Sequence, residues 1–205
     1  GFVEMAKEIV TARYPTLDTP DYTSIIDDRA FNRITNALQD AKERGATLVQ
    51  LIPGKAWDKK TRKIAPHVVL NAPADCELRT REIFGPILPV IGYTNIEDTI
   101  TIINNGPRPL ALYPFSNKKK QVHHLITHVM SGGVTVNDGI LHTAQHDMPF
   151  GGVGDSGMGH YHGYEGFLTF SKMRPVFYQA PFSAVKFMYP PYGKFATKYL
   201  DFLTK

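Results

Sequence analysis

The sequence predicts an α/β fold in which helices flank a parallel sheet. Between residues 87 and 137, strand patterns alternate with helix patterns in the order strand, helix, strand, helix, strand. Strands that are joined through a helix by short links run parallel, with right-handed crossovers. The 205 residues are 42% hydrophobic and 20% charged, which is the composition of an ordinary globular protein. These observations place the chain in the α/β class.

Two amphipathic helices are expected before that alternation. The first begins at residue 2 and ends before Pro15, because apolar residues recur at helical spacing up to that point. The second spans residues 28–44 and is followed by Gly45 as its C-cap. Its apolar stripe consists of Phe31, Ile34, Leu38 and Ala41. A helix that opens the chain without a cap suggests a piece of a longer protein.

The segments between residues 46 and 70 are predicted as two strands and a loop. Residues 46–52 and 67–70 have strand patterns, the latter bounded by prolines. Residues 53–65 carry five basic residues and are expected to form a solvated loop. The sheet would thus begin before the alternating part.

The alternating part is predicted element by element. Strands are expected at residues 87–93, 110–115 and 134–137. The first helix is expected at residues 95–105. Its second helix is capped by Ser116 and ended by Gly132.

Two later segments lose regular periodicity. Residues 138–166 hold eight of the seventeen glycines, and a loop of this length is usually functional or packed against another part. Residues 171–205 carry six Lys and Arg against one acid, with a strand-like stretch at 176–179 and the run Tyr-Pro-Pro-Tyr at 189–192. We expect domain boundaries of 1–170 and 171–205, with the tail draped over a surface or a partner subunit.

Several classes of protein are excluded or disfavoured. No apolar run reaches the ~20 residues of a membrane helix, and no signal peptide opens the chain. The single cysteine excludes an internal disulfide and suits a reducing compartment, so a cytoplasmic location is expected. The net charge of +4 is mild, and the basic clusters at 55–63 and 118–120 indicate solvated charge, not a nucleic-acid interface. Neither membrane nor nucleic acid is an expected partner.

For three motifs, a structural interpretation is favoured over a functional site. The G-x-G-x-x-G at residues 152–157 has no strand before it and no acid about 20 residues after it, so a Rossmann fingerprint is disfavoured. The eight histidines include His124 and His128 at helical spacing, but no metal-ligand motif, and no metal is expected. Cys76 is flanked by two carboxylates and has no helix N-terminus or cation beside it in sequence, which predicts an inert thiol.

One stretch, residues 81–86, combines residue types that suggest a binding site. If it is extended, alternation points Glu82 and Phe84 the same way, before a Gly-Pro turn. A carboxylate can accept two hydroxyl hydrogen bonds, and a neighbouring ring offers a face for stacking. The pair suits a ribose diol beside a flat heterocycle, although a salt-bridged glutamate and a core phenylalanine remain open.

Several motifs in series resemble the NAD(P)-dependent aldehyde dehydrogenases. Residues 82–86 match the family's E-I-F-G-P signature, and residues 148–152 resemble its P-F-G-G motif. The run at 149–163 is similar to the class 3 branch. Residues 131–138 and 141–150 point to the bacterial coniferyl aldehyde dehydrogenases within it. The resemblance covers essentially the whole chain, and it implies the parallel-sheet catalytic domain of the aldehyde dehydrogenase fold.

The resemblance also implies roles for three residues. Glu82 would bind the hydroxyls of the nicotinamide ribose of NAD or NADP, and Phe84 would pack near the nicotinamide ring. Phe150 would line the aldehyde tunnel. The glycine-rich loop would then form a wall of that tunnel, and the strand at 176–179 with the tail would serve a homodimer interface.

The family's primary catalytic groups have no counterpart in these 205 residues. The nucleophilic cysteine lies in a G-Q-x-C context that this sequence lacks, and Cys76 does not match it. The resemblance therefore implies the C-terminal part of an enzyme that oxidises an aldehyde to a carboxylic acid through a cysteine thiohemiacetal. No catalytic residue is assigned within this chain, which is expected to be inactive alone.

Two other readings stay open at this point. The chain could be an interaction module, a catalytically dead homologue whose basic tail docks a partner. It could also be a free-standing thiol hydrolase that uses Cys76 with one of the eight histidines.

Overall fold

The computed structural model describes residues 1–204, which form two compact units, residues 1–98 and residues 99–204. The first contains β1 (Thr47–Gln50), β4 (His67–Leu70) and β5 (Ile87–Val90) in one sheet, in the order β1-β4-β5. β1 and β4 are antiparallel with Thr47 opposite Leu70, and β4 and β5 are parallel with His67 opposite Ile87.

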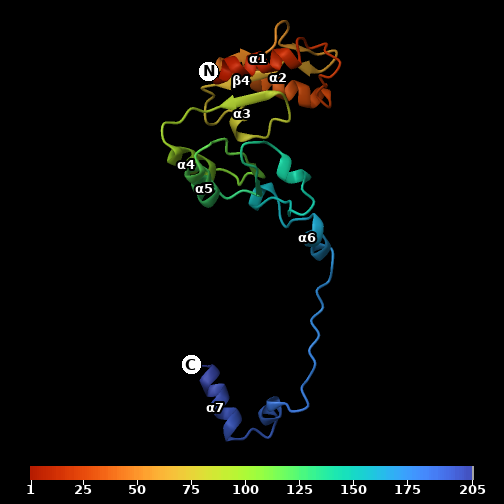
Figure 1. Cartoon of the computed structure of the whole chain (residues 1–205), viewed down its shortest axis with the longest axis vertical. Coiled ribbons are helices and arrows are strands. Elements are labelled where there is room, and N and C mark those ends of the chain that lie inside the picture. The colour runs from red at the N-terminus through yellow and green to blue at the C-terminus, as the bar shows by residue number, and fades with distance from the viewer. Residues whose placement is uncertain (205) are drawn as a thin grey trace. The chain divides into compact units, whose positions relative to one another are not determined.

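Helices and a small hairpin complete the first unit (Figure 1). They are α1 (Phe2–Arg13), α2 (Asp28–Glu43), α3 (Glu77–Thr80) and the hairpin of β2 (Trp57–Asp58) with β3 (Lys63–Ile64). α2 begins where the Asp27 carboxylate accepts a hydrogen bond from the Ala30 N–H at 2.7 Å. After α2, Gly45 takes a φ of +94°, which an L residue with a side chain rarely adopts.

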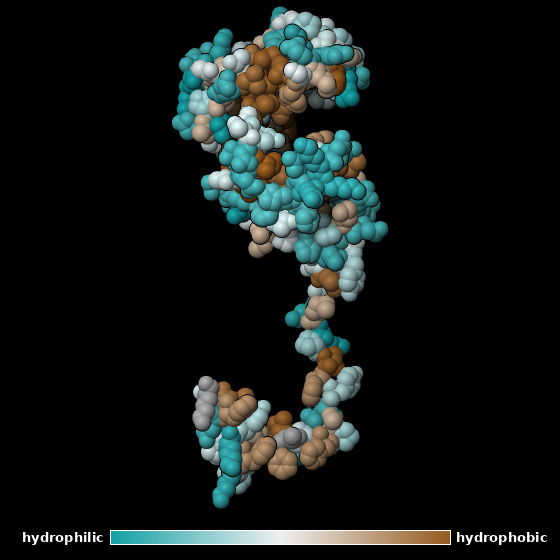
Figure 2. Space-filling view, turned by 60° about the vertical axis from the view of Figure 1, so that its left-hand side comes forward, coloured by the Kyte–Doolittle hydropathy of each residue, from teal (hydrophilic) through white to brown (hydrophobic). Residues whose placement is uncertain are grey.

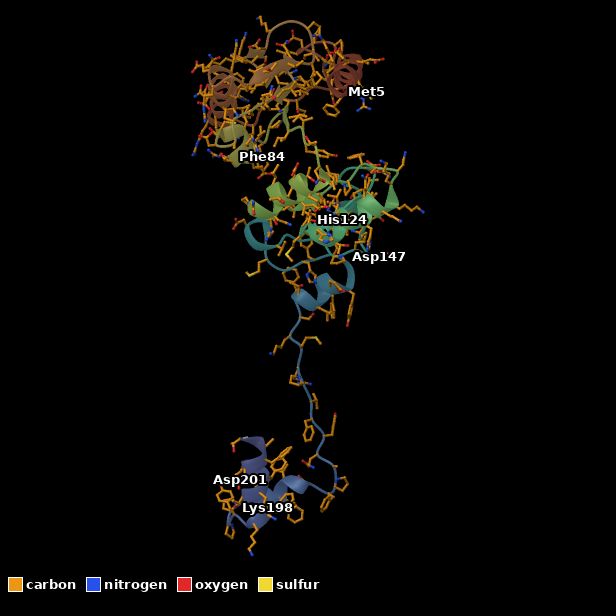
Figure 3. All side chains as sticks on the ribbon, turned by 90° about the vertical axis from the view of Figure 1, so that its left-hand side faces the viewer. Met5, Phe84, His124, Asp147, Lys198 and Asp201 are labelled. Carbon is orange, nitrogen blue, oxygen red and sulfur yellow. The ribbon has the colours of Figure 1, made fainter. Side chains whose placement is uncertain are left out.

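The core of the first unit lies between α2, β4 and α3. Its buried residues come from these elements and their neighbours: Phe31, Ile34, Ala37, Leu38, Ala41, Ala46, Ile64, Val69, Cys76, Leu78 and Ile87. The apolar stripe predicted for the second helix is therefore confirmed, with Ala37 added to it. α1 differs, because none of its residues is buried, and Phe2 and Met5 are each more than half exposed. Figure 2 shows hydrophobic surface on this unit, and Figure 3 shows Met5 on α1.

The second unit has little sheet. α4 (Ile96–Asn105) begins at the boundary, and β6 (Ala111–Leu112) and β7 (Gly133–Val134) pair in parallel across α5 (Lys119–His128). Three short 3₁₀ helices follow, at Leu141–Ala144, Gly154–Ser156 and Ala184–Met188. α6 (Gly163–Thr169) and α7 (Lys194–Leu203) complete the unit.

Several predicted elements need correction. The loop expected at 53–65 contains the β2–β3 hairpin, because Ile64 and Ala65 are buried in the core and fix it. The strand expected at 176–179 is not formed in the described chain (Figure 1). A strand gains stability through ladder hydrogen bonds, and the backbone of this segment makes none. α3 and α6 have four and seven residues and are too short to have been predicted. α7 was missed although it is as long as α4 and α5.

The parallel strands of the alternating part do not form one sheet. β5 joins β4 and the antiparallel β1, whereas β6 and β7 form a separate pair. The parallel arrangement predicted for strands joined through a helix holds for β6 and β7. No described helix is long and apolar enough to cross a membrane.

Candidate functional site

Residues 81–86 form a turn between α3 and β5. The expectation of an extended segment is wrong, since Phe84 has a φ of +50° in the left-handed region, which is unusual for a bulky residue. Its ring is 78% exposed (Figure 3). Glu82 is exposed as well, and its carboxylate has no hydrogen-bond or ion-pair partner among the described residues. The turn therefore presents a free carboxylate and a free aromatic face.

α2 contacts this turn from the inside of the unit. Arg33 donates hydrogen bonds to the Ile83 carbonyl at 2.5 Å and to Glu77 at 3.2 Å. The next residue, Ile34, is fully buried. If Gly85 carried a Cβ, that atom would lie only 2.7 Å from the Cδ1 of Ile34. A glycine at that position lets the turn lie directly on the helix. Arg33 could not be recognised from the sequence, because it stands beside the apolar stripe and has the pattern of a solvated charge.

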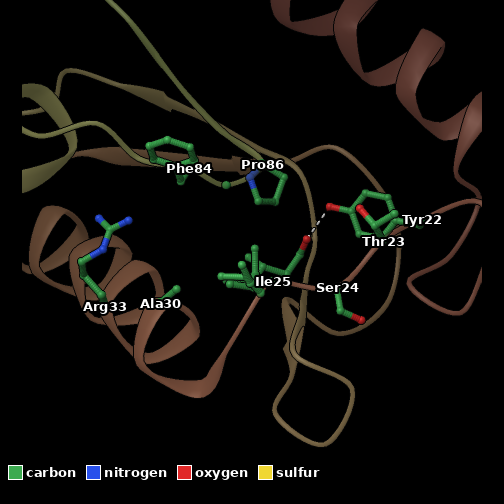
Figure 4. Close-up of a pocket in the computed structure, with 11 residues that line it drawn as sticks. Tyr22, Thr23, Ser24, Ile25, Ala30, Arg33, Phe84 and Pro86 are labelled. Atoms are coloured by element: carbon green, nitrogen blue, oxygen red, sulfur yellow. Dashed lines mark hydrogen bonds between the residues drawn. The ribbon is translucent and has the colours of Figure 1, made fainter. Parts of the chain in front are cut away.

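A pocket of about 530 Å³ opens beside the turn (Figure 4). Phe84, Gly85 and Pro86 lie along one side of it, and residues 22–26 and Arg33 along the other. Tyr22 donates a hydrogen bond to the Ile64 carbonyl at 2.5 Å, and burial raises the pKa of its hydroxyl. The pocket thus has a largely apolar wall that includes the exposed Phe84, with Arg33 as its charged member.

Phe150 belongs to the second unit, where it forms an antiparallel bridge with Tyr161. Its ring stacks on His162 with centroids 5.8 Å apart, and the rings of Tyr161 and His142 lie at 5.7 and 5.9 Å. Phe150 also lines a pocket of about 400 Å³ together with the glycine-rich residues 151–159. The structure thus combines the predicted substrate residue with the glycine-rich loop, as the resemblance implies.

Two glycines of that loop and Gly132 before it allow backbone to pack against backbone. A Cβ on Gly152 would overlap the Ser156 carbonyl, and one on Gly151 would overlap that of Gly159. A Cβ on Gly132 would overlap the Gly151 carbonyl. Within the G-x-G-x-x-G run, Gly152 thus serves close packing, and Gly154 and Gly157 take φ values of +63° and +153°. This use of the glycines agrees with the view that a Rossmann fingerprint is disfavoured.

Cys76 lies in the core of the first unit. Its side chain is 1% exposed, although α3 begins directly after it, a helix start that the sequence analysis did not find. The neighbouring Asp75 pairs with Arg44 at 2.5 Å, which lowers the pKa of that carboxyl. A buried thiol is inaccessible to an aldehyde or an acyl substrate. The structure therefore does not support the hypothesis of a thiol hydrolase.

The histidines are distributed over both units without forming a metal centre. Within residues 1–204, no group of three or more His, Cys, Asp and Glu side chains is placed to hold a metal ion. The rings of His124 and His128 on α5 have centroids 4.2 Å apart and are tilted by 44°, and the Nδ1 of His128 lies 2.8 Å from the His124 carbonyl.

The comparisons with known proteins agree with the signature residues. The model of the aldehyde dehydrogenase family matches residues 1–176. The chain is 50% identical over 194 residues to the probable coniferyl aldehyde dehydrogenase of Pseudomonas aeruginosa, covering 94% of this chain and 40% of that protein. It is 39% identical over 173 residues to the dimeric NADP-preferring aldehyde dehydrogenase of Rattus norvegicus, covering 83% and 36%.

A solved structure supports the fold. The substrate-bound AldH of Staphylococcus aureus superposes with a TM-score of 0.77 at 32% identity, covering 97% of this chain and 42% of that one. The chain spans about two fifths of the length of these relatives. The α/β fold expected from the resemblance is thereby confirmed. Because the family match extends over most of the sequence, this chain belongs to the aldehyde dehydrogenase family.

Proposed function

We propose that this chain supplies the cofactor-orienting turn and part of the aldehyde tunnel of an NAD(P)-dependent aldehyde dehydrogenase. The observation that carries the proposal is the turn at residues 81–86, where Glu82 and Phe84 are exposed beside a pocket of about 530 Å³. Two large or charged side chains held free on a turn with a left-handed residue indicate a site that something else completes.

The free groups of the turn fit the nicotinamide end of the cofactor. The Glu82 carboxylate has its acceptor positions available for two ribose hydroxyls, and the Phe84 ring is available to pack beside a flat ring. When bound, NAD(P) supplies the acceptor for the hydride of the aldehyde carbon. The contribution of this chain is positional, because Glu82 and Phe84 limit the orientations of the ring that accepts the hydride.

Phe150 and the glycine-rich loop are proposed to line the aldehyde tunnel. The ring of Phe150 is held by three other aromatic or imidazole rings, and the pocket it lines is walled by backbone that glycines bring close. An aromatic lining favours an aromatic aldehyde, and the relative from Pseudomonas aeruginosa is named for coniferyl aldehyde. We therefore propose an aromatic aldehyde of the coniferyl type as the substrate.

The nucleophile of the proposed enzyme is a cysteine other than Cys76. Attack of a thiolate on the aldehyde gives a thiohemiacetal, and hydrolysis of the later thioester gives the carboxylic acid. The sole cysteine of this chain is buried in the core, so these 205 residues alone are proposed to be inactive.

A homodimer in the cytoplasm is proposed for the whole enzyme. Figure 2 shows hydrophobic surface along the tail. Phe177, Tyr178 and Phe202 of the tail are each at least 75% exposed. Exposed apolar patches of this kind mark interaction surfaces, and the relative from Rattus norvegicus is named as dimeric. The single cysteine suits a reducing compartment.

The test is Glu82→Gln in the chain extended upstream to the length of its relatives. Glutamine keeps the size but loses the charge and one acceptor, so we expect kcat to fall about tenfold or more with an unchanged thermal midpoint. Glu43→Gln, at the exposed end of α2, is the matched control and should keep normal turnover. Normal turnover of Glu82→Gln would remove the cofactor role of this residue.

A further inference from the structure

The turn at residues 81–86 has no regular structure to fix its shape. It lies between the four-residue helix α3 and β5, and Phe84 is held at a φ of +50°. A bulky residue stays in that region only when its surroundings impose it. The groups that hold the turn must therefore come from elsewhere in the first unit.

Arg33 is the side chain that reaches the turn from the greatest distance in sequence. One amino group of its guanidinium donates to the Ile83 carbonyl at 2.5 Å, fifty residues along the chain, and the other donates to Glu77 at 3.2 Å. The Arg33 side chain is only 19% exposed, so these charge-assisted bonds are partly shielded from water. The Ile83 carbonyl belongs to the peptide between Ile83 and Phe84, which adjoins the left-handed residue.

Glu77 connects the two ends of this network. Its Oε1 accepts from Arg33 at 3.2 Å and from Arg81 at 3.4 Å, where the turn begins. The planar guanidinium of Arg33 can bond a carboxylate and a carbonyl at once, which a lysine ammonium on a flexible stem does less well. Ile34, on the buried side of α2, also limits movement of the turn, because it lies against Gly85.

We propose that Arg33 and Glu77 are positioning residues for cofactor binding. They hold the peptide after Ile83 so that Glu82 and Phe84 keep the geometry that the nicotinamide ribose requires. This inference rests on the proposed function and deepens it, since neither residue needs to touch the cofactor. Its ligand class is the nicotinamide nucleoside end of NAD(P), as distinct from the adenosine diphosphate end.

The experiment compares two ligands on the chain extended upstream to the length of its relatives. NADH contains the ribose that Glu82 would bind, and ADP lacks it. For Arg33→Met we expect the Kd of NADH to rise about tenfold, while the Kd of ADP stays unchanged. Arg33→Lys should fall between the wild type and Arg33→Met, because one donor group of the fork is lost.

The matched control is Arg44→Met. Arg44 stands at the end of the same helix and pairs with Asp75 and Asp40, but makes no contact with the turn. It should leave both dissociation constants unchanged. An equal weakening of NADH and ADP by Arg33→Met, or no change in either, would overturn the positioning role.

Glu82→Gln separates this inference from the proposed function. If Glu82→Gln weakens NADH binding and Arg33→Met does not, the positioning role is wrong and the proposed function stands. If neither weakens it, both are wrong. Should Arg33→Met fail to fold, amide hydrogen exchange of residues 81–85 in Arg33→Lys should be faster than in the wild type, and equal protection would contradict the inference.

Discussion

Each unit of the chain is stabilised internally in a different way. In the first unit, side chains from α2, β4 and α3 bury each other, and Ile34 and Leu38 are completely inaccessible. In residues 131–161 of the second unit, order comes from backbone packed on backbone at Gly132, Gly151 and Gly152. The described buried hydrophobic side chains of the second unit are few, namely Ile100, Val122, Val129 and Ala196. The first unit presents the turn at residues 81–86 from a side-chain core, whereas the second presents Phe150 beside close-packed glycine backbone.

The largest effect that follows from this comparison is expected at Leu38. Leu38→Ala leaves a cavity in the core and should lower the free energy of unfolding of the first unit by about 2–5 kcal/mol. Urea unfolding followed by the fluorescence of Trp57, the single tryptophan, reports on this unit. Leu200→Ala is the control, because Leu200 on α7 is 48% exposed, and it should change the Trp57 transition by less than about 0.5 kcal/mol. Equal effects would contradict the difference between the units.

The next effect is expected in the close-packed glycine backbone of the second unit. Gly152→Ala places a methyl group on the Ser156 carbonyl and should destabilise residues 131–161 by about 1–3 kcal/mol, because backbone must move. Amide hydrogen exchange in this segment measures the change, and the Trp57 transition should not move. Gly139→Ala meets nothing within 4 Å and serves as the control. Unchanged exchange in Gly152→Ala would show that close backbone packing does not hold this region.

A smaller, pH-dependent effect is expected at His67 in β4. His67 is 5% exposed, and burial lowers the pKa of its imidazole although Nδ1 lies 2.6 Å from the Ala65 carbonyl. Because the unfolded chain binds the proton more readily, stability should be complete above about pH 7 and fall as the pH drops below about 6.5. The slope should approach about 1.4 kcal/mol per pH unit at most.

Urea unfolding of the 205-residue chain at pH 7.5, 6.5 and 5.5 measures this dependence. His67→Gln removes the titrating group and should flatten the curve in that range. A variant that keeps the same slope would assign the dependence to another group and contradict the role of His67.

The smallest effect is expected at Tyr22, in the wall of the pocket beside the turn. Tyr22→Phe removes the hydrogen bond to the Ile64 carbonyl and should cost about 0.5–1.5 kcal/mol in the free energy of unfolding. Tyr93→Phe, at a residue that is 59% exposed, should cost nothing measurable in the same urea titration. Equal losses in both variants would show that the buried hydroxyl adds no stability.

An element could be predicted from the sequence where a local pattern marks it, and could not where only tertiary contacts decide it. The stripe of α2 was found from periodicity because its core partners lie within the same unit, and the boundaries of β4 were found because prolines flank a β-branched run. The hairpin of β2 and β3 was missed because two-residue strands give no period, and Ile64 is buried only by tertiary packing. The strand at 176–179 was expected from β-branched and aromatic residues, but without ladder partners that composition does not form a strand.

The candidate site was predictable in its residue types and not in its shape. Glu82 and Phe84 were identified from chemistry and resemblance, and the structure leaves both exposed on one turn. Alternation failed at Phe84 because its φ is positive, and its neighbours Ile83 and Gly85 lie against Arg33 and Ile34, about fifty residues earlier. A local pattern has no access to a contact of that separation.

The most direct test of the account is NADH formation from coniferyl aldehyde and NAD. The 205-residue chain and a chain extended upstream to the length of its relatives would be assayed side by side. We predict activity in the extended chain alone, because this chain is proposed to supply only the cofactor turn and the tunnel lining, and its single thiol is buried. Activity of the 205-residue chain that is abolished by alkylation of Cys76 would contradict the account.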